Sequence, residues 1–258
     1  MPKLEQYSYS KLAAFEQCKY QYWLTYIKKE KGESNAFSEF GSFVHSLCEE
    51  YEKGHLAVYE LADKYREDYF NTIQHEFPPN KYVDLGEQYY QDGLNFLYDF
   101  DGLDDYKILG AEDEFTEEID DPEGNFKIKG FVDLEYEDPN QLLVVHDWKS
   151  MSKFKSKAEQ EHKARQLYMY ALRIYRKFGR YPDLLRFYLF RKQKPVDIKF
   201  NIDDYNKAWD WVHKTVSDIR HCSEFPASYD KFFCDNLCDF RNVCEQKNNS
   251  KELFNHSF

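Results

Sequence analysis

Gly130-Phe131-Val132-Asp133 and Leu142-Leu143-Val144-Val145-His146-Asp147-Trp148-Lys149 flank Asp138-Pro139-Asn140, a sequence typical of a turn. Together they predict an antiparallel hairpin with strands over residues 125–136 and 142–149. A turn at the proline places Asp133 opposite Val145. Because alternate side chains of a strand share a face, Asp147 and Lys149 point the same way, and Asp147 is a diagonal neighbour of Asp133, about 7–8 Å away between backbones.

Two carboxylates and a lysine on one face of this hairpin form a candidate catalytic centre. Asp133 and Asp147 could bind Mg²⁺ or Mn²⁺ through oxygen. Lys149 could position an attacking water and offset charge that develops on a phosphate. Such a pattern alone is more often the solvated end of exposed strands. The glycine-led approach to Asp133 and the apolar strand leading to Asp147 favour a site. Glu112 and Glu114, on a neighbouring strand, either assist it or lie on an exposed face.

Hydrophobic periodicity predicts an α/β chain with a helical first part. Ser8 is a candidate N-cap for a helix that continues through Trp23. Further helices are expected over residues 37–51, 59–75, 88–100, 158–178 and 205–221, and strands over 107–119, 185–191 and 196–200 besides the hairpin. We expect one domain over residues 1–245, divided into a helical part (1–105), a catalytic core (106–202) and a C-terminal helix with cysteines (203–245), and then a polar tail (246–258).

Charge and apolar patterning restrict the partners. With 35 Lys and Arg against 47 Asp and Glu, the net charge is −12, which disfavours non-specific DNA binding unless positive charge is local. One local basic stretch follows the hairpin, and it is either a DNA contact or a solvated loop: Lys153, Lys155, Lys157, Lys163 and Arg165. No apolar run approaches the roughly 20 residues that span a bilayer. The N-terminus lacks a signal-peptide pattern, so we expect no membrane partner and a cytoplasmic location.

The cysteines indicate a second metal site. Cys234, Cys238 and Cys244 form C-x3-C-x5-C, a cluster of thiols that suits zinc or iron–sulfur in a reducing compartment. A fourth ligand is needed. Cys48 and Cys222 have no partner at ligand spacing and are expected to be buried or idle thiols.

The combined motifs resemble the PD-(D/E)XK nuclease superfamily, in the branch of the RecB-like nuclease domain and the CRISPR adaptation exonucleases. The resemblance covers residues 8–244 and rests on the hairpin, on Gly41-Ser42-Phe43-Val44-His45, and on Gln166 and Tyr170 in a Gln-x-x-x-Tyr pattern. It implies a restriction-endonuclease-like core, a central mixed sheet flanked by helices, with Asp133, Asp147 and Lys149 as catalytic residues. It also implies that His45, both aspartates and the Trp148 carbonyl bind Mg²⁺ or Mn²⁺, and that Gln166 and Tyr170 orient the lysine, water or substrate.

The same resemblance implies a [4Fe-4S] cluster held by Cys18, Cys234, Cys238 and Cys244. Such a cluster would join the first helix to the C-terminal segment as a staple. The first two C-terminal cysteines are usually separated by two residues in this branch and by three here, so zinc remains an alternative. The implied activity is exonucleolytic cleavage of single-stranded DNA or DNA ends in recombination, repair or replication, with a possible helicase or recombination partner. The rival hypotheses are a non-catalytic DNA-binding scaffold with a degenerate nuclease fold and a zinc-stapled regulatory protein.

Overall fold

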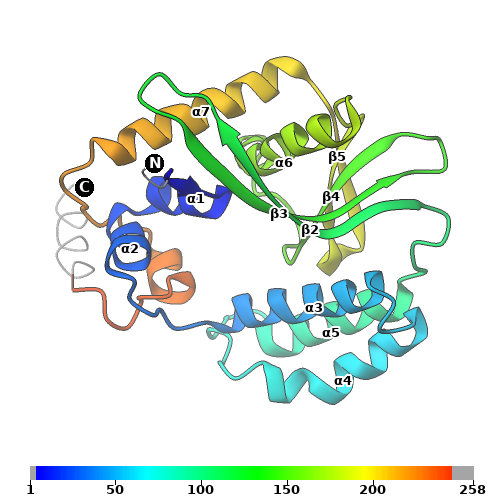
Figure 1. The fold of residues 1–258 in the computed structure, drawn as a ribbon. Coiled ribbons are helices and arrows are strands. Elements are labelled where there is room, and N and C mark those ends of the chain that lie inside the picture. Colours follow the sequence, from blue (N-terminus) through cyan, green and yellow to red (C-terminus); the bar gives the residue numbers. More distant parts are fainter. Residues whose placement is uncertain (1–3, 246–258) are drawn as a thin grey trace.

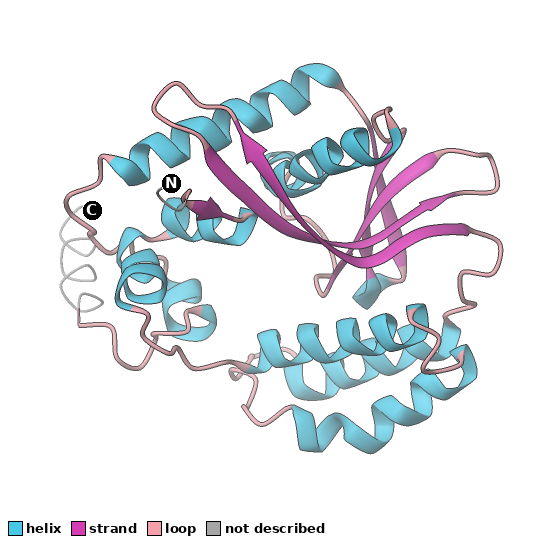
Figure 2. Ribbon diagram, viewed as in Figure 1, coloured by secondary structure: helices cyan, strands magenta, loops and turns pink. Residues whose placement is uncertain are grey.

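The computed structural model describes residues 4–245 and shows a six-stranded mixed sheet with helices on both sides (Figure 1, Figure 2). The strand order is β1-β3-β4-β5-β6, with β2 paired to β3. The pairs β1–β3 and β4–β5 are parallel, and the other pairs are antiparallel. The predicted α/β fold with a central mixed sheet is therefore confirmed. The strands are β1 (Gln6–Tyr7), β2 (Lys107–Ile119), β3 (Phe126–Glu137), β4 (Leu143–Lys149), β5 (Leu184–Leu189) and β6 (Lys194–Lys199).

Strand β3 organises the sheet because three strands pair with it. One edge pairs with β2 along its length. The other edge is shared: β1 pairs with Lys127 and Ile128 near its start, and β4 pairs with residues 134–137 near its end. Between these contacts, residues 129–133 of this edge pair with no strand of the described chain. Asp133 lies in that unpaired interval.

Two helical layers cover the sheet. Helices α6 (Lys157–Phe178) and α7 (Ile202–Arg220) lie on one face, whereas α3 (Ala36–Glu52), α4 (Leu61–Thr72) and α5 (Leu85–Asp99) form a layer on the other side (Figure 1). Each layer has its own apolar core. Val145 belongs to the core under α6 and α7, and Trp148 belongs to the core of α3–α5. Strand β4 is thus buried on both faces, which explains its continuous apolar sequence.

The first helical segment is interrupted where the sequence predicts continuity. Ser8 caps α1 (Tyr9–Gln17) as predicted, and its hydroxyl accepts a hydrogen bond from Lys11 N at 3.2 Å. The predicted continuation through Trp23 is wrong. Cys18 adopts an extended conformation and ends α1, after which α2 (Lys19–Tyr22) and a π-helical turn (Trp23–Lys28) follow. This break turns the Cys18 side chain toward the C-terminal segment, where its sulfur accepts a hydrogen bond from Ser228 N.

The remaining helices and strands are present with shifted ends. The predicted helix 59–75 is a 3-10 turn (Val58–Glu60) followed by α4, and α5 starts earlier than predicted because the Asp84 side chain caps it. The predicted strand 185–191 ends at Leu189, where a 3-10 turn begins. Helix α6 starts after its cap Ser156 and ends at Gly179, whose φ of 72° suits glycine.

Strand β1 is too short to be predicted from its sequence. The predicted polar tail, residues 246–258, lies outside the described residues. Within residues 4–245, no helix combines the length and the apolar character that a bilayer crossing requires.

Candidate metal centre

The hairpin register differs from the prediction by two residues. Val145 pairs with Glu135, so the predicted position of Asp133 opposite Val145 is wrong. The turn is centred on Asn140 rather than on the proline, because the Asp138 carboxylate accepts a hydrogen bond from Leu142 N at 2.9 Å and Asp138 N donates to Leu142 O at 3.0 Å. A shift of two residues keeps each side chain on its face. Asp133 nevertheless lies against the Trp148 backbone N–H next to Asp147, so the acidic residues stay close although the pairing changes.

The two strands of the hairpin diverge at the candidate centre. Strand β4 continues beside β5, and its last residues leave β3. The Trp148 N–H donates instead to Asp133 Oδ2 at 2.8 Å. This bond holds Asp133 against the backbone between Asp147 and Lys149. The carboxylates of Asp133 and Asp147 are both buried, at 8% and 1% exposure.

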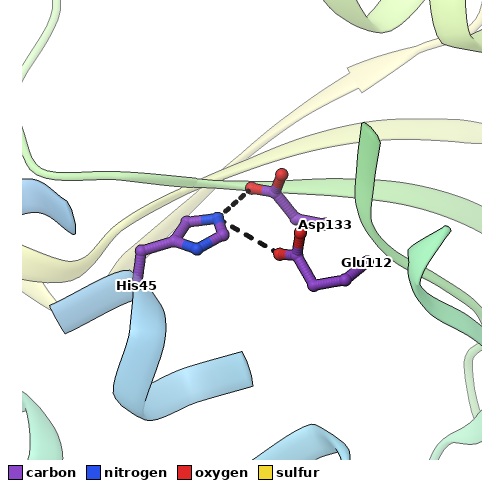
Figure 3. A group of neighbouring side chains, drawn as sticks. All are labelled: His45, Glu112 and Asp133. Carbon is purple, nitrogen blue, oxygen red and sulfur yellow. Dashed lines mark ion pairs between the residues drawn. The ribbon is translucent and has the colours of Figure 1, made fainter. Parts of the chain in front are cut away.

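Three potential metal ligands meet in this gap (Figure 3). His45 comes from α3, Glu112 from β2 and Asp133 from β3. His45 Nε2 lies 3.1 Å from Asp133 Oδ2 and 3.5 Å from Glu112 Oε1. One ligand atom from each residue lies within 4.8 Å of the other two. Because three separate elements supply these groups, the whole fold is needed to bring them together.

Glu112 reaches the centre through an unusual backbone conformation. Its φ is 51°, in the left-handed region that non-glycine residues rarely adopt, although it lies within β2. Its Oε1 is buried and accepts no hydrogen bond from the described residues. The sequence left two interpretations of Glu112 and Glu114 open: one of them assists metal or substrate binding, or both lie on an exposed strand face. The structure brings Glu112 to the centre, whereas Glu114 pairs with Lys129 at 2.7 Å.

Lys149 lies beside these ligands in a chain of polar contacts. Its ammonium is 2.6 Å from Asp147 Oδ2 and donates to Gln166 Oε1 at 3.0 Å. Gln166 Nε2 in turn donates to the Tyr170 hydroxyl at 2.8 Å. Gln166 and Tyr170 share one face of α6, as their spacing of four indicates. The chain fixes the position of the ammonium from two directions.

Gly130 permits this arrangement. A Cβ at this position would lie 2.9 Å from the Tyr170 ring and 2.7 Å from the Phe115 ring. Real Cβ atoms do not approach other atoms so closely, so a side chain at Gly130 would push Tyr170 away from β3. The glycine that precedes Asp133 in the sequence therefore supports the position of Gln166, and through it that of Lys149.

The protonation of the centre follows from its buried charges. Burial acts to lower the pKa of His45, but the hydrogen bond and charge of Asp133 and the charge of Glu112 raise it to about 9. Burial raises the pKa of Glu112 to about 7. Burial also acts to raise the pKa of Asp133, yet the hydrogen bond and charge of His45 hold it below its ordinary value. Without a cation the site thus holds a protonated imidazole between carboxylates.

These groups suit a divalent cation. Carboxylate oxygens are the preferred donors for Mg²⁺ and Mn²⁺, and an imidazole nitrogen is better suited to a transition metal. The buried Glu112 Oε1 lacks a hydrogen-bond donor in the described chain, as expected of an oxygen that binds a cation. The His45 imidazolium neutralises two carboxylates. A metal cation bound between them would neutralise the same charges. Asp147 is near enough for its charge to raise the pKa of His45, but its carboxylate is directed to Lys149.

The five basic residues after the hairpin lie in different surroundings. Lys153, Lys155 and Lys157 are exposed, and Lys157 pairs with Glu161 at 3.4 Å. Arg165 pairs with Glu16 at 3.2 Å and stacks on a tryptophan ring. The remaining one, Lys163, is half-buried on α6. Its pKa is lowered by burial and by the charge of Lys149, which places it near the centre.

The four predicted cysteine ligands line one cavity between α2 and the C-terminal segment. Cys18, Cys234, Cys238 and Cys244 all border it. Burial, together with the neighbouring thiols, raises the pKa of Cys238 to about 11. Tyr20 N donates to Pro226 O at 3.2 Å, so the two segments also join through the backbone. The two remaining cysteines do not border this cavity. Cys48 lies in the core of α3–α5, and Cys222 follows α7.

A π-helical turn lies between the first two C-terminal cysteines, which are separated by three residues. The turn covers Phe233–Leu237, and Cys238 N donates to Phe233 O at 2.8 Å, five residues back. A π-helical turn is wider than an α-helical turn by one residue. At this spacing, Cys234 and Cys238 border the same cavity.

A family model and a solved structure match this chain. The family model of the PD-(D/E)XK nuclease superfamily matches residues 6–245. No curated protein matches the sequence. A solved structure titled "Crystal structure of SSO0001" is 14% identical, with 96% of this chain and 89% of that chain covered and a TM-score of 0.43. The family match spans the helical part, the hairpin and the cysteines alike, and the chain belongs to the PD-(D/E)XK nuclease superfamily.

Proposed function

We propose that the chain is a divalent-metal-dependent deoxyribonuclease that acts as an exonuclease on single-stranded DNA or DNA ends. The observation that carries the proposal is the meeting of His45, Glu112 and Asp133 beside the Asp147–Lys149 pair, in a chain of this superfamily. Residues 1–245 would form one nuclease domain. A role in recombination, repair or replication, with a helicase or recombination partner, follows from the RecB-like resemblance.

The roles of the residues follow from their positions. His45, Glu112 and Asp133 would hold Mg²⁺ or Mn²⁺, with Asp147 and the Trp148 carbonyl as adjacent donors. The bound ion would polarise a phosphoryl oxygen and lower the pKa of a water. Lys149, held by Asp147 and Gln166, would donate to that water or to a phosphate oxygen and offset the developing negative charge. Gln166 and Tyr170 keep the ammonium in place.

We further propose that the four cysteines hold a [4Fe-4S] cluster. Their common cavity and the crowding of their thiols support a metal there. Thiolate ligands need a reducing compartment, which agrees with a cytoplasmic location. The cavity lies beside α1 and α2, away from the residues of the metal centre, so the cluster would hold the fold and take no part in cleavage.

The proposed function is tested with end-labelled single- and double-stranded DNA in Mg²⁺ or Mn²⁺. We expect labelled mononucleotides or short products from single strands, and none after addition of EDTA. A protein that binds DNA and never cuts it, with either ion, would instead be the non-catalytic scaffold. A protein that neither binds nor cuts DNA would contradict both hypotheses.

We expect metal affinity to rise with pH in a way that reports on His45. Only the neutral imidazole binds a cation, so each ion that binds below about pH 9 displaces a proton. Below about pH 7, Glu112 must also lose a proton. The affinity for Mn²⁺ should therefore rise about tenfold per pH unit above pH 7 and more steeply below it. Isothermal titration calorimetry from about pH 6 to 8.5 measures both slopes.

His45→Gln is the matched variant for this prediction. It should reduce by one the number of protons released per bound ion, which lowers the slope over the whole range. The proton that Glu112 releases should come off at higher pH, because the charge of His45 no longer lowers the pKa of Glu112. It should also weaken Mn²⁺ more than Mg²⁺, because Mg²⁺ gains less from a nitrogen ligand. An unchanged pH slope in His45→Gln would show that His45 does not bind the ion.

We expect Lys163 to contribute more to DNA binding than its exposed neighbours. No ion pair engages its ammonium within the described chain, and the positive charge of Lys149 is near. A DNA phosphate would supply the missing anion. Lys163→Ala should weaken single-stranded DNA binding and reduce the slope of log Kd against log salt by about 0.7, the value for one phosphate contact. Lys157→Ala, whose partner is Glu161, should leave that slope unchanged.

A further inference from the structure

One exposed aromatic ring belongs to the residue two positions before Asp133 on β3. Phe131 is 45% exposed, although its neighbours on β3, Gly130 and Val132, are buried against α6 and the main core. Phe131 and Asp133 are alternate residues of one strand and share a face. Their positions on β3 are separated by about 7 Å. Phe131 is therefore the nearest residue before Asp133 that shares its face of β3.

The opposite strand repeats this arrangement. Glu114 pairs with Phe131, and Glu112, two residues earlier in β2, lies toward Asp133. Lys129 pairs with Glu114 at 2.7 Å, and its ammonium lies 5.0 Å from the centre of the Phe131 ring. These contacts come from one side and fix the ring without covering it. What distinguishes Phe131 from the other exposed rings is its place on β3, two residues from Asp133.

We propose that Phe131 is a stacking platform for one base of the DNA strand, next to the phosphate that is cleaved, and that it makes the enzyme prefer single strands. This inference rests on the proposed nuclease function. A strand whose phosphate lies at His45 and Asp133 must place its adjoining nucleotide about one nucleotide length away, where the ring is found. Every base has a π face, so stacking is independent of sequence. In a duplex the bases are already stacked and paired, so this contact is denied to them.

The contact is tested by removing the ring and the base in turn. Cleavage efficiency is measured on one single-stranded oligonucleotide and on a series in which one base at a time is replaced by an abasic residue. Phe131→Ala should lower kcat/KM on the intact strand about ten- to a hundredfold, and at one position the abasic strand should lose as much with the parent protein. At that position Phe131→Ala should cause no further loss, because the partner of the ring is already absent.

Three variants separate stacking from other effects. Phe131→Trp keeps a π face and should retain efficiency and single-strand preference, whereas Phe131→Leu keeps apolar area without a π face and should behave as the alanine variant. Phe70→Ala removes a ring that is 75% exposed on α4 and should change nothing. The proposal would be overturned if Phe131→Ala lowered kcat/KM by the same factor on every abasic strand as on the intact strand. A leucine variant as efficient as the parent would overturn it too.

Failure of the proposed function gives a different result. If the parent protein cuts no DNA, the nuclease assignment fails, and the ring is then tested by fluorescence anisotropy with the same abasic series. If the parent cuts DNA but Phe131→Ala lowers the efficiency equally on every abasic strand, the nuclease assignment stands and only the stacking role is overturned. Thermal melting of each variant confirms that an exposed position has been changed without unfolding.

Discussion

Lys149→Ala should abolish DNA cleavage while the protein stays folded. We expect the single-turnover rate to fall at least about a hundredfold, because the variant loses the one ammonium that Asp147 and Gln166 hold at the centre. Asp147 would then lose its ion-pair partner in a buried place. Burial already raises the pKa of Asp147, and without the lysine it would take up a proton rather than remain charged. Melting should therefore shift by only a few degrees, about what a small change in stability produces.

The control for this prediction is Lys153→Ala, an exposed lysine four residues further on. It should cut at the parent rate. Asp133→Ala and Asp147→Ala should also lose cleavage, and Asp133→Ala should in addition lose Mn²⁺ binding measured by calorimetry. Cleavage by Lys149→Ala or Asp147→Ala at the parent rate would place the catalytic centre elsewhere in the chain.

Replacement of a cavity cysteine should have the second large effect, on the fold rather than on catalysis. Purified without oxygen, the parent should be brown, with a broad absorption near about 400 nm from cysteine-bound iron. Cys18→Ser, Cys234→Ser, Cys238→Ser and Cys244→Ser should each lose colour and soluble yield together. The reason is that binding energy at a site absent from the unfolded chain becomes folding energy, and here it joins Cys18 to a segment more than two hundred residues away.

Two other cysteines provide matched controls. Cys222→Ser changes a partly exposed thiol, and Cys48→Ala changes one buried in the core of α3–α5. Both should keep the colour, and Lys149→Ala should keep it as well. Absence of iron and sulfide from anaerobic protein, or a full cluster in Cys18→Ser, would contradict the cluster. Stoichiometric zinc would keep the staple and replace the cluster with a zinc site.

The sequence predicted the faces of side chains better than their pairing. Asp147 and Lys149 share a face whatever the register, because strand alternation is unaffected by a shift of two residues. The register itself depended on the turn, where the bonds between Asp138 and Leu142 move the centre from Pro139 to Asn140, and a displacement of one residue there changes the pairing by two. Pattern reasoning therefore gave the correct fold class and neighbourhood, and the wrong partner for Asp133.

Glu112 could not be chosen from the sequence for a related reason. Alternation gives Glu112 and Glu114 one face. The register of β2 on β3 decides between them, because Glu114 pairs with Phe131 and Glu112 lies two residues nearer Asp133, where its carboxylate reaches His45 with a left-handed backbone. A residue with a strained backbone inside a strand has no characteristic sequence pattern. The break of the first helix at Cys18 is similar, because the residues around it are compatible with a continuous helix and the tertiary contacts of the C-terminal segment decide otherwise.

The π-helical turn before Cys238 has a consequence for how relatives are aligned. In an α-helix, one inserted residue rotates everything after it by about 100° and changes the direction in which the following segment leaves the helix. The hydrogen bond from Cys238 N to Phe233 O accommodates one residue more than an α-helical turn does, and Cys234 and Cys238 both border the cavity. Such an insertion changes the spacing of the cysteines in the sequence, while both cysteines still border the cavity. Alignments should therefore place a gap inside this turn, and count C-x2-C and C-x3-C as one motif, before recording the loss of a cysteine ligand.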